Sequence, residues 1–554
     1  MKKNYLLIMF VLCICTNLYS QNTVGTISNV SGSYNGFTLF TPNPSTETYL
    51  INNCGEVVHQ WSSTFTPGNA VYVLENGNLL RTGKIDNSFI SIGGIGGKIE
   101  LFDWDNTLLW EYTYSSTNVS QHHDIYPLPN GNILMLALSI ISEADAIQAG
   151  RDPFKIGQNQ LYGEHILELE PILGTNQANI VWEWYLKDHL IQDIDNTKDN
   201  FGVVADNEQL LDINFFNNEN SPGVANWIHA NSIQYNATLD QIVLSSRFLS
   251  EIYIIDHSTT TAEAASHTGG TYGKGGDFLY RWGNPEAYGH GDGTDQKLFG
   301  QHYPHWIADG LTDAGKIIVF NNGAERSLDG EGLPINYSSV DIITPPETSP
   351  GVYTYDAVNG YGPTDVEWTY TDPIEATNFY SSILSSGQRL PNGNTLICSG
   401  AQGYFFEIDS NKNIVWEYIN PDTSFGIVTQ GDTPSSNSVF RALKYPLDYP
   451  AFIRKDLTPR GPIELMSDTS NCSVLNTIDF KLADLKIVPN PAIDILNIKT
   501  TETINNIEVY SVIGKLVATD QNSNQIDISQ LKSGLYIVKI YSGEAVTSRK
   551  IVKK

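Results

Sequence analysis

The sequence predicts an all-β protein, a six-bladed β-propeller followed by a small immunoglobulin-like β-sandwich. The main observation is a phrase that recurs six times with variations, an apolar strand that closes on a tryptophan. The six tryptophans are Trp61, Trp110, Trp182, Trp282, Trp368 and Trp416. Three turn-plus-strand phrases, at Glu75, Pro129 and Pro391, contain Asn-Gly, which supplies the positive φ angles of a tight hairpin turn. Such units, repeated at irregular spacing, are typical of propeller blades, and we expect the tryptophans to pack between blades.

Composition restricts the class of partner. The 554 residues suffice for one large and one small domain. Only 17% of the residues are charged, as expected for short strands joined by turns. The formal net charge of -29 argues against nucleic acid or an anionic membrane as partner. After the N-terminal region no stretch is long and apolar enough to predict a transmembrane segment.

The N-terminal residues 1–20 have the pattern of a secretory signal peptide, with Lys2 and Lys3 before an apolar run and cleavage expected near Ser20. The remaining cysteines are Cys54, Cys398 and Cys472, too few for a disulfide scaffold and not assignable to a pair. No CxxC or other zinc spacing occurs. We therefore expect no metal ligands and no cofactor.

Four segments follow from these patterns: the signal peptide, a propeller over 21–455, a connection over 456–482 and a β-sandwich over 483–554. The last segment resembles the type A sorting domain of the Bacteroidetes type IX secretion system. The resemblance rests on Pro489-Asn490-Pro491, the strands from Val509 and Ser533, and the Lys-rich terminus. It implies export by the type IX machinery, to the medium or the outer cell surface.

Several histidines come just before predicted strands, where the innermost strand of a blade would begin. They are His229, His302 and the adjacent His122-His123. Because these beginnings line a propeller channel, we expect the imidazoles and nearby arginines to converge on the axis. Imidazole acts as nucleophile or acid, and guanidinium binds tetrahedral oxyanions, so the set suits phosphate, sulfate or carboxylate chemistry. The imidazoles could instead hold a metal. In a regular strand, only one of His122 and His123 can face the channel.

Most of residues 35–455 resemble the arylsulfate sulfotransferase family, periplasmic six-bladed propellers that move a sulfuryl group between phenols through a sulfohistidine, without a nucleotide donor. The matching motifs are Trp227–Ile233 with Leu244–Arg247, Gln301–Trp306, Asn322–Arg326 and Arg441-Ala442-Leu443. The resemblance implies that His229, His302 and Arg326 hold the sulfuryl oxygens and transfer protons. It also implies an aryl sulfate donor, a phenolic acceptor and a set of anion-binding residues, namely Asn231, Arg247, His305, Arg441 and His123.

One departure from the family concerns the nucleophile. The position of the nucleophilic histidine is taken by Tyr404, and no histidine follows His305. A phenol with a pKa of about 10 is a poor nucleophile at neutral pH unless cations lower that pKa. Three outcomes remain: another histidine attacks (His302, His305 or the His122-His123 pair), transfer is direct, or the ring only binds. The alternative to an enzyme is therefore a non-catalytic propeller that binds a sulfated or otherwise anionic ligand, such as a sulfated polysaccharide, at the cell surface.

The other histidines are expected to have structural or surface roles. Structural roles are favoured for His59, His165 and His189. A Gly/Thr-rich insertion carries His257, His267 and His290, which are expected to be exposed loop residues.

Overall fold

The computed structural model describes residues 22–215, 224–328, 332–468, 472, 485–500, 503–511, 515–542 and 545–554. The predicted signal peptide lies outside the described residues. The chain divides into two compact units, Met1–Cys472 and Ser473–Lys554. Among the described residues, no helix has the length and apolar character needed to cross a membrane.

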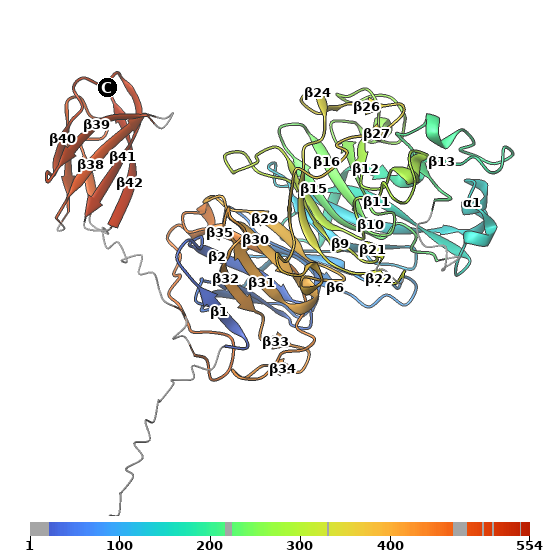
Figure 1. Ribbon diagram of the computed structural model, residues 1–554, viewed down its shortest axis with the longest axis horizontal. Helices are drawn as coiled ribbons and strands as arrows, with labels where there is room; N and C mark the ends of the chain where they lie inside the picture. Colours follow the sequence, from blue (N-terminus) through green and yellow to red (C-terminus); the bar gives the residue numbers. More distant parts are fainter. Residues whose placement is uncertain are drawn as a thin grey trace, which may run out of the picture. The chain divides into compact units, whose positions relative to one another are not determined.

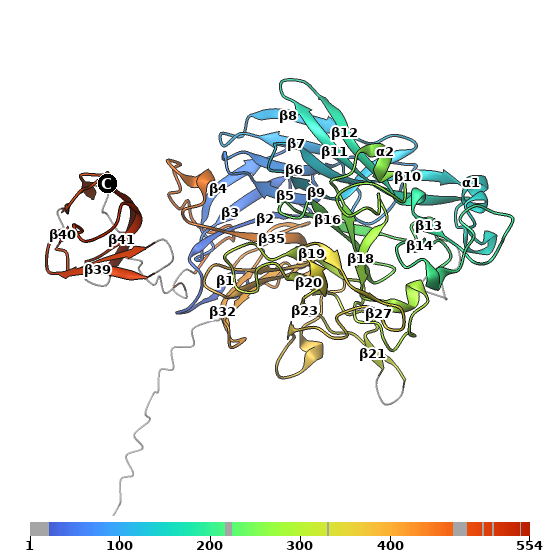
Figure 2. The same cartoon turned by 90° about the horizontal axis from the view of Figure 1, so that it is seen from above.

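The described part of the first unit contains six antiparallel sheets of four or five strands (Figures 1 and 2). From the inner strand outward, the first three sheets are β35 (Val439–Pro446), β2 (Gly36–Pro42), β3 (Glu47–Ile51), β4 (Val57–Ser62); β5 (Pro67–Val73), β6 (Leu79–Lys84), β7 (Gly97–Phe102), β8 (Leu108–Thr113); and β9 (Val119–Pro127), β10 (Ile133–Ser142), β11 (Gln160–Ile172), β12 (Gln177–Tyr185). The next three are β15 (Ala230–Asn236), β16 (Gln241–Ser246), β17 (Glu251–Asp256), β18 (Phe278–Trp282); β19 (His302–Trp306), β20 (Ile317–Asn321), β23 (Ser339–Ile343), β28 (Trp368–Tyr370); and β29 (Ser386–Arg389), β30 (Thr395–Ser399), β31 (Tyr404–Ile408), β32 (Ile414–Ile419), β1 (Gly25–Asn29).

The connections between these strands contain short helices, 3₁₀ turns and pairs of short strands. The helices are α1 (Glu143–Gln148) and α2 (Thr261–Ala264), with 3₁₀ turns that include η2 (Leu186–Asp188) and η6 (Gly400–Gln402). The paired short strands are β13 (Leu190–Ile191) with β14 (Leu211–Asp212), β21 (Ser327–Leu328) with β22 (Pro334–Ile335), β24 (Glu347–Ser349) with β25 (Val352–Tyr353), β26 (Tyr355–Asp356) with β27 (Gly360–Tyr361), and β33 (Asp422–Thr423) with β34 (Gly426–Ile427).

The inner strands form a closed ring. In order, β5, β9, β15, β19, β29 and β35 each contact the next, and β35 contacts β5. Two sheets combine strands from both ends of this unit: β35 pairs with β2, and β1 pairs with β32. Radial repetition of sheets in a closed ring leaves only short, protected strand edges. The predicted propeller fold is thus confirmed.

Each of the six tryptophans lies on the fourth strand of its sheet and reaches the sheet that follows. The indole N–H of Trp61, for example, donates to the Asp103 carbonyl at 3.0 Å, and that of Trp416 donates to the Asn53 carbonyl at 2.8 Å. Trp368 instead stacks under the Arg389 guanidinium, 4.3 Å from the ring centre. These contacts confirm the predicted packing of the tryptophans between sheets, because burial of an aromatic body with a satisfied N–H fits such a junction.

A disulfide joins Cys54, in the turn between β3 and β4, to Cys472. The two cysteines are 418 residues apart in the sequence, and Cys398 is buried and free. The sequence left this pairing open. The bond ties the end of the first unit to its first sheet.

Removal of this disulfide is expected to destabilise the first unit. The double variant Cys54→Ser/Cys472→Ser should lose about 2–4 kcal/mol of unfolding free energy, because the cross-link restricts a very long loop in the unfolded chain. Urea unfolding followed by tryptophan fluorescence, with and without a reducing agent, measures this loss. An equal stability of the oxidised wild type and the variant would contradict the structural role.

The second unit consists of a three-stranded and a four-stranded sheet. The strands are β36 (Lys486–Val488), β37 (Ile495–Lys499) and β40 (Gln525–Asp527), then β39 (Leu516–Gln521), β38 (Asn506–Ser511), β41 (Gly534–Ser542) and β42 (Ala545–Lys553). Alternating apolar side chains of both sheets, such as Leu496, Val509 and Ile540, form one core. This is the packing of a β-sandwich, in agreement with the alternating pattern of the sequence.

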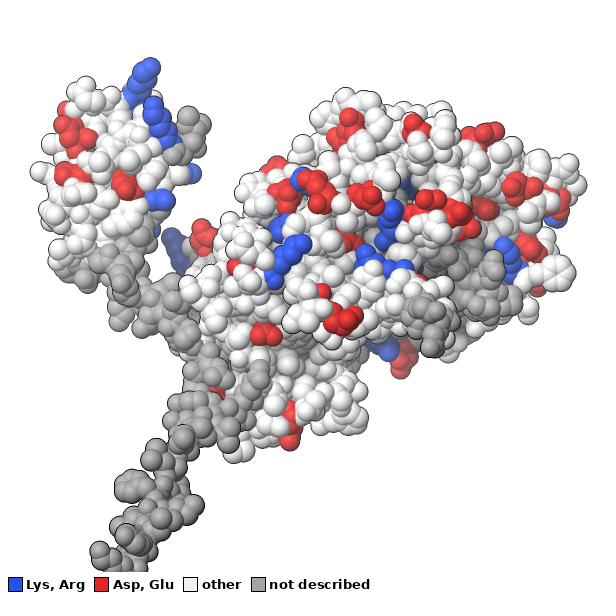
Figure 3. Space-filling model, in the orientation of Figure 1, with Lys and Arg blue, Asp and Glu red and all other residues white. Residues whose placement is uncertain are grey.

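One face of the first unit carries more acidic than basic side chains. On the face seen in Figure 3, Asp and Glu side chains are spread widely, with a few Lys and Arg side chains between them. This distribution agrees with the net charge of -29, which disfavours nucleic acid as a partner.

Candidate functional site

Three inner strands begin with the same backbone irregularity. Left-handed backbone angles occur at His123 (φ 50°) in β9, at His229 (φ 50°) just before β15 and at Tyr303 (φ 54°) in β19. The register of each strand with its neighbour shifts at this point, as in a β-bulge. A bulge re-aims side chains and breaks the alternation of a regular strand. At the bulge in β9, His123 approaches His229, whereas Nε2 of His122 lies against Glu164 of the same sheet.

The bulges bring four imidazoles together, which we call the histidine cluster: His122, His123, His229 and His302. The ring centres of His123 and His229 are 4.9 Å apart, and those of His122 and His123 are 5.2 Å apart. All four come from the beginnings of inner strands, so the predicted convergence of His123, His229 and His302 at one end of the ring is found.

A hydrogen-bonded chain runs from a carboxylate to His123. Nε2 of His122 lies 2.8 Å from Oε2 of Glu164 on β11, and Nδ1 of His122 lies 2.9 Å from Nδ1 of His123. Because a carboxylate accepts, the His122 ring donates from Nε2. With one proton on the ring, its Nδ1 accepts. The Nδ1–H of His123 must then be the donor of the second bond. This assignment, made from the network, leaves a lone pair on Nε2 of His123.

The other two rings are also fixed through Nδ1. Nδ1 of His302 donates to Oδ1 of Asn322 at 2.7 Å, and the Asn322 amide group donates to the carbonyls of Ser381 and Leu384. His302 therefore carries its lone pair on Nε2. In contrast, Nδ1 of His229 accepts from the Asn226 amide at 2.7 Å, which leaves Nε2 of His229 as an N–H donor. The cluster thus offers both lone pairs and a proton.

Burial and a nearby arginine lower the pKa of His123, His229 and His302 and so keep these three imidazoles neutral. Burial and the charge of Arg247 lower the pKa of His302 to about 3 and hold the pKa of His229 well below its usual range. Burial, with the neighbouring imidazoles and Arg247, does the same to the pKa of His123. Arg247 is anchored by a hydrogen bond to the Ser382 carbonyl at 3.2 Å, and its Nε has no partner among the described residues. An uncompensated guanidinium beside neutral imidazoles suits an anionic ligand.

The depressed pKa of His302 predicts acid sensitivity. Its folded pKa of about 3 lies below the unfolded value near 6.5, so its contribution to stability is complete above pH 6.5 and declines as pH falls. Between pH 6.5 and 5 the wild type should lose about 1 kcal/mol per pH unit from this residue. Urea unfolding at several pH values measures the slope, which should be smaller for His302→Asn; equal slopes would contradict the prediction.

Arg441 belongs to the middle of the ring. Its guanidinium pairs with Asp124 at 2.8 Å, donates to the Tyr72 hydroxyl at 2.7 Å and lies 3.6 Å from the centre of the Tyr303 ring. Gln234 donates to the same Tyr72 hydroxyl at 3.1 Å. Five inner strands thus meet in one buried network. The charge of Arg441, expected to bind an anion, is here compensated by Asp124.

The remaining predicted residues are distributed around the cluster or away from it. Asn231 donates to the Gln301 carbonyl at 2.6 Å, and its buried Oδ1 has no partner among the described residues. Arg326 is bound by Ser339 at 2.6 Å and stacks 4.6 Å from the Tyr337 ring centre. Among the described residues, none of the contacts of Arg326 involves the histidine cluster.

Tyr404 lies on β31, the third strand of its sheet, rather than on an inner strand. Its hydroxyl donates to Glu417 at 2.6 Å, and its ring stacks on Phe406. Burial and the Glu417 carboxylate raise the pKa of Tyr404 far above its usual range. The cations that would activate this phenol are not among its described contacts, so its environment disfavours nucleophilic attack.

His305 lies near the far end of β19 from His302. It lines a cavity of about 1140 Å³ together with residues at the C-terminal ends of the inner strands, among them Tyr126, Tyr235, Trp306 and Tyr445. The Arg441–Asp124 network separates these strand ends from the strand beginnings that hold the cluster. His305 therefore faces a different mouth of the ring.

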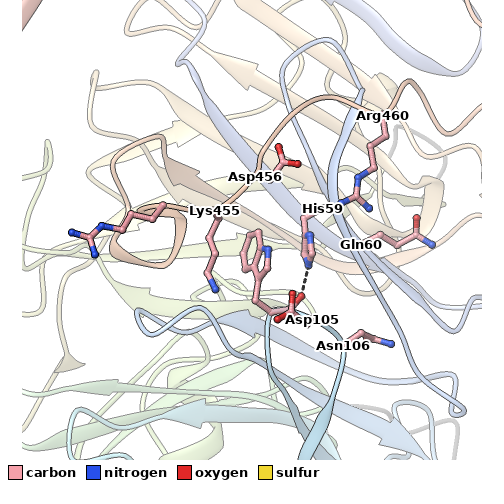
Figure 4. Close-up of a pocket in the computed structure, with 9 residues that line it drawn as sticks. His59, Gln60, Asp105, Asn106, Lys455, Asp456 and Arg460 are labelled. Atoms are coloured by element: carbon pink, nitrogen blue, oxygen red, sulfur yellow. Dashed lines mark hydrogen bonds between the residues drawn. The ribbon is translucent and has the colours of Figure 1, made fainter. Parts of the chain in front are cut away.

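A smaller pocket of about 480 Å³ surrounds His59 (Figure 4). The His59 ring stacks on Trp104, and its Nε2 lies 2.8 Å from the Trp104 carbonyl oxygen. Around it lie Lys455, Asp456 and Arg460 of the segment that follows β35. Since no inner strand contributes to this pocket, we keep the structural role expected for His59.

Sequence reasoning missed the supports of the cluster. Glu164 was not considered, although an acidic residue inside the apolar run of β11 is itself a signal. Gly94, in the loop before β7, was also missed: a Cβ there would lie 2.1 Å from Nε2 of His123.

The histidines of the insertion differ in exposure. His257 and His290, expected to be exposed, are nearly buried and bonded to Asp240 and Tyr355, whereas His267 is exposed as predicted.

Comparison with known proteins places this geometry in context. The family described as Arylsulfotransferase (ASST) matches residues 23–441, and the family described as Secretion system C-terminal sorting domain matches residues 486–554. No curated protein matches the chain by sequence. The sorting domain indicates type IX export, so the protein is secreted or reaches the cell surface.

Solved structures share only a distant likeness. A protein of unknown function from Bacteroides caccae is 10% identical, with 74% of this chain and 98% of that chain covered and a TM-score of 0.38. The virginiamycin B lyase from Staphylococcus aureus is 11% identical, with 75% and 96% covered and a TM-score of 0.30. These values carry no argument about activity. By its family match over residues 23–441, the chain belongs to the arylsulfotransferase family.

Proposed function

We propose that the protein transfers a sulfuryl group from an aryl sulfate to a phenolic acceptor, without a nucleotide donor, at the histidine cluster. One observation carries the proposal. The Nδ1 atoms of His123, His229 and His302 are all hydrogen-bonded, while the Nε2 atoms of His123 and His229 have no hydrogen-bond partner among the described residues. Three imidazoles fixed through one nitrogen, beside the Arg247 charge, are prepared to act on an anionic group.

We assign the nucleophile to His123 rather than to His302. Both rings carry a lone pair on Nε2, but their Nδ1 protons face different acceptors. The His123 proton faces His122, which is backed by Glu164, whereas the His302 proton faces the neutral Asn322 amide oxygen. As Nε2 of His123 bonds to sulfur, its Nδ1 proton passes to His122, whose positive charge the Glu164 carboxylate stabilises. An amide oxygen cannot take that proton.

The transfer then has two balanced halves. In the first half, Nε2 of His123 attacks sulfur, the bond from sulfur to the aryl oxygen breaks, and the leaving group departs as a phenolate that accepts a hydrogen bond from the Nε2–H of His229. In the second half, the acceptor phenol gives its proton to the departed phenolate, and its oxygen attacks sulfur. The nitrogen–sulfur bond of His123 breaks, and the proton on His122 returns to Nδ1 of His123. Arg247 compensates the sulfuryl charge throughout.

Arg247 takes the role that the family resemblance gave to Arg326. Electrostatic interaction with Arg247 contributes to the lowered pKa of His123, His229 and His302, whereas Arg326 interacts with Ser339 and, at 3.9 Å, with Asp341. We therefore expect substitution of Arg247 to affect donor binding more than substitution of Arg326.

Incubation of the mature chain with 4-nitrophenyl sulfate and excess phenol tests the proposed function. The expected result is release of nitrophenolate that depends on the acceptor and is lost in His123→Asn, with His59→Asn as a matched histidine control. Absence of turnover with several phenols, in a protein shown to be folded, would reject the enzyme. Retained binding of a sulfated glycan would then support the alternative of a binding propeller.

A further inference from the structure

Outside the histidine cluster, two histidines and an aspartate converge on one point. His189 follows η2, His267 follows α2, and Asp277 immediately precedes β18. Oδ1 of Asp277 lies 2.7 Å from Nδ1 of His189 and 2.8 Å from Nδ1 of His267. The three candidate ligand atoms all lie within 4.8 Å of one another. Two imidazole nitrogens and a carboxylate oxygen are a common donor set for divalent transition metals.

The orientation of the His189 ring is set by the contact of its second nitrogen. Nε2 of His189 lies 2.8 Å from the Ala264 carbonyl oxygen, and a carbonyl only accepts hydrogen bonds. Nε2 is therefore taken up by the backbone, and Nδ1 is the ring nitrogen that faces the Asp277 carboxylate, at 2.7 Å. A ring that donates its far N–H to a backbone carbonyl is the usual arrangement of a metal-binding histidine.

Neighbouring residues hold the His189 ring in place, while the His267 side of the group is open to solvent. The Trp184 ring stacks on His189, with 5.5 Å between ring centres and 4° between planes. The Trp184 N–H donates to the Gly276 carbonyl at 2.7 Å, and a Cβ at Gly276 would lie 2.6 Å from Nε2 of His189. His189 and Asp277 are buried, whereas the His267 side chain is 61% exposed. Solvent can therefore complete the coordination of an ion on the His267 side.

We propose that His189, His267 and Asp277 bind a divalent transition metal ion of the zinc class, with water as the further ligand. The ion would join the segment after η2 to the insertion that contains α2 and to the start of β18. Its role is structural, because these residues belong to outer connections and not to the inner strands. The sequence did not predict this site, since its ligands lie far apart and lack the spacing of a zinc motif.

Metal binding by the mature chain tests this proposal. After removal of metals with a chelator, calorimetric titration with ZnCl₂ should show one bound ion per chain and a higher unfolding temperature, with MgCl₂ giving neither. His267→Asn should weaken zinc binding by at least about tenfold. Because the His267 side chain is exposed, this variant should fold, and circular dichroism checks that it does. His59→Asn should bind zinc like the wild type.

Two results would overturn the proposal. One is the absence of zinc binding by the folded wild type, which would mean that a proton bridges His189 and Asp277. The other is equal zinc affinity in the wild type and His267→Asn, which would place the ion elsewhere. Sulfuryl transfer is measured separately, so the two proposals can fail independently.

Discussion

Replacement of His123 with asparagine is expected to lower the rate of sulfuryl transfer by at least about 10³-fold. The physical reason is the loss of the attacking nitrogen, because the catalysis left to binding and charge alone is small when a covalent nucleophile is removed. His123 sits on a bulge with its Nδ1 bonded to His122, and asparagine tolerates the left-handed backbone angle of this position. Steady-state turnover of 4-nitrophenyl sulfate with excess phenol measures the effect.

Glu164, which supports His123 through His122, is expected to give a smaller loss of activity when it is replaced. Glu164→Gln keeps the size of the side chain but removes the carboxylate that accepts from His122 at 2.8 Å. We expect kcat to fall by about 10²–10⁴-fold with little change in KM, as when the carboxylate of a catalytic triad is replaced by an amide. Tyr404→Phe should leave kcat unchanged. A loss of kcat in Tyr404→Phe, with normal kcat in His123→Asn, would contradict the assignment of the nucleophile.

Asp124→Ala is expected to destabilise the first unit by about 3–5 kcal/mol, because it leaves the buried Arg441 guanidinium without a compensating charge. Asp124 and Arg441 are both buried, and their contact at 2.8 Å connects β9 to β35 across the ring. Urea unfolding monitored by tryptophan fluorescence measures the change. The network also includes Tyr72 and Tyr303, so the loss should spread over several inner strands.

A double variant separates the charge from the packing. Asp124→Leu/Arg441→Met removes both charges and should recover a large part of the lost stability, since paired apolar replacements of a buried ion pair are often nearly neutral. If Asp124→Ala alone is as stable as the wild type, the Arg441–Asp124 pair does not hold the ring together.

Much of the fold followed from local pattern. Trp61, Trp416 and the other four tryptophans mark the fourth strand of each sheet, because a large aromatic side chain fills the junction with the next sheet and its N–H, except in Trp368, finds an acceptor there among the described residues. The Cys54–Cys472 pair did not follow, because its partners are brought together only by closure of the whole ring. Long-range pairing of this kind leaves no signal in one sequence.

Local sequence pattern also predicted part of the candidate site. The histidines His229 and His302 precede recognisable strands, and their convergence follows from the propeller fold. The contact between His122 and His123 depends on a bulge, which no alternation pattern shows. The positions of Arg326 and Tyr404, taken from the family resemblance, depend on loop geometry and on the partners Ser339 and Glu417, which the sequence does not reveal.

The central claim is that an imidazole of the histidine cluster carries the sulfuryl group between donor and acceptor. Its most direct test is incubation of the mature chain with an aryl sulfate in the absence of acceptor, followed by rapid quenching and peptide mass mapping. We predict one sulfuryl group on the peptide that contains His123 and its disappearance on addition of phenol. A sulfuryl group on the peptide of His302 or Tyr404, or none on an enzyme that turns over, would contradict this account.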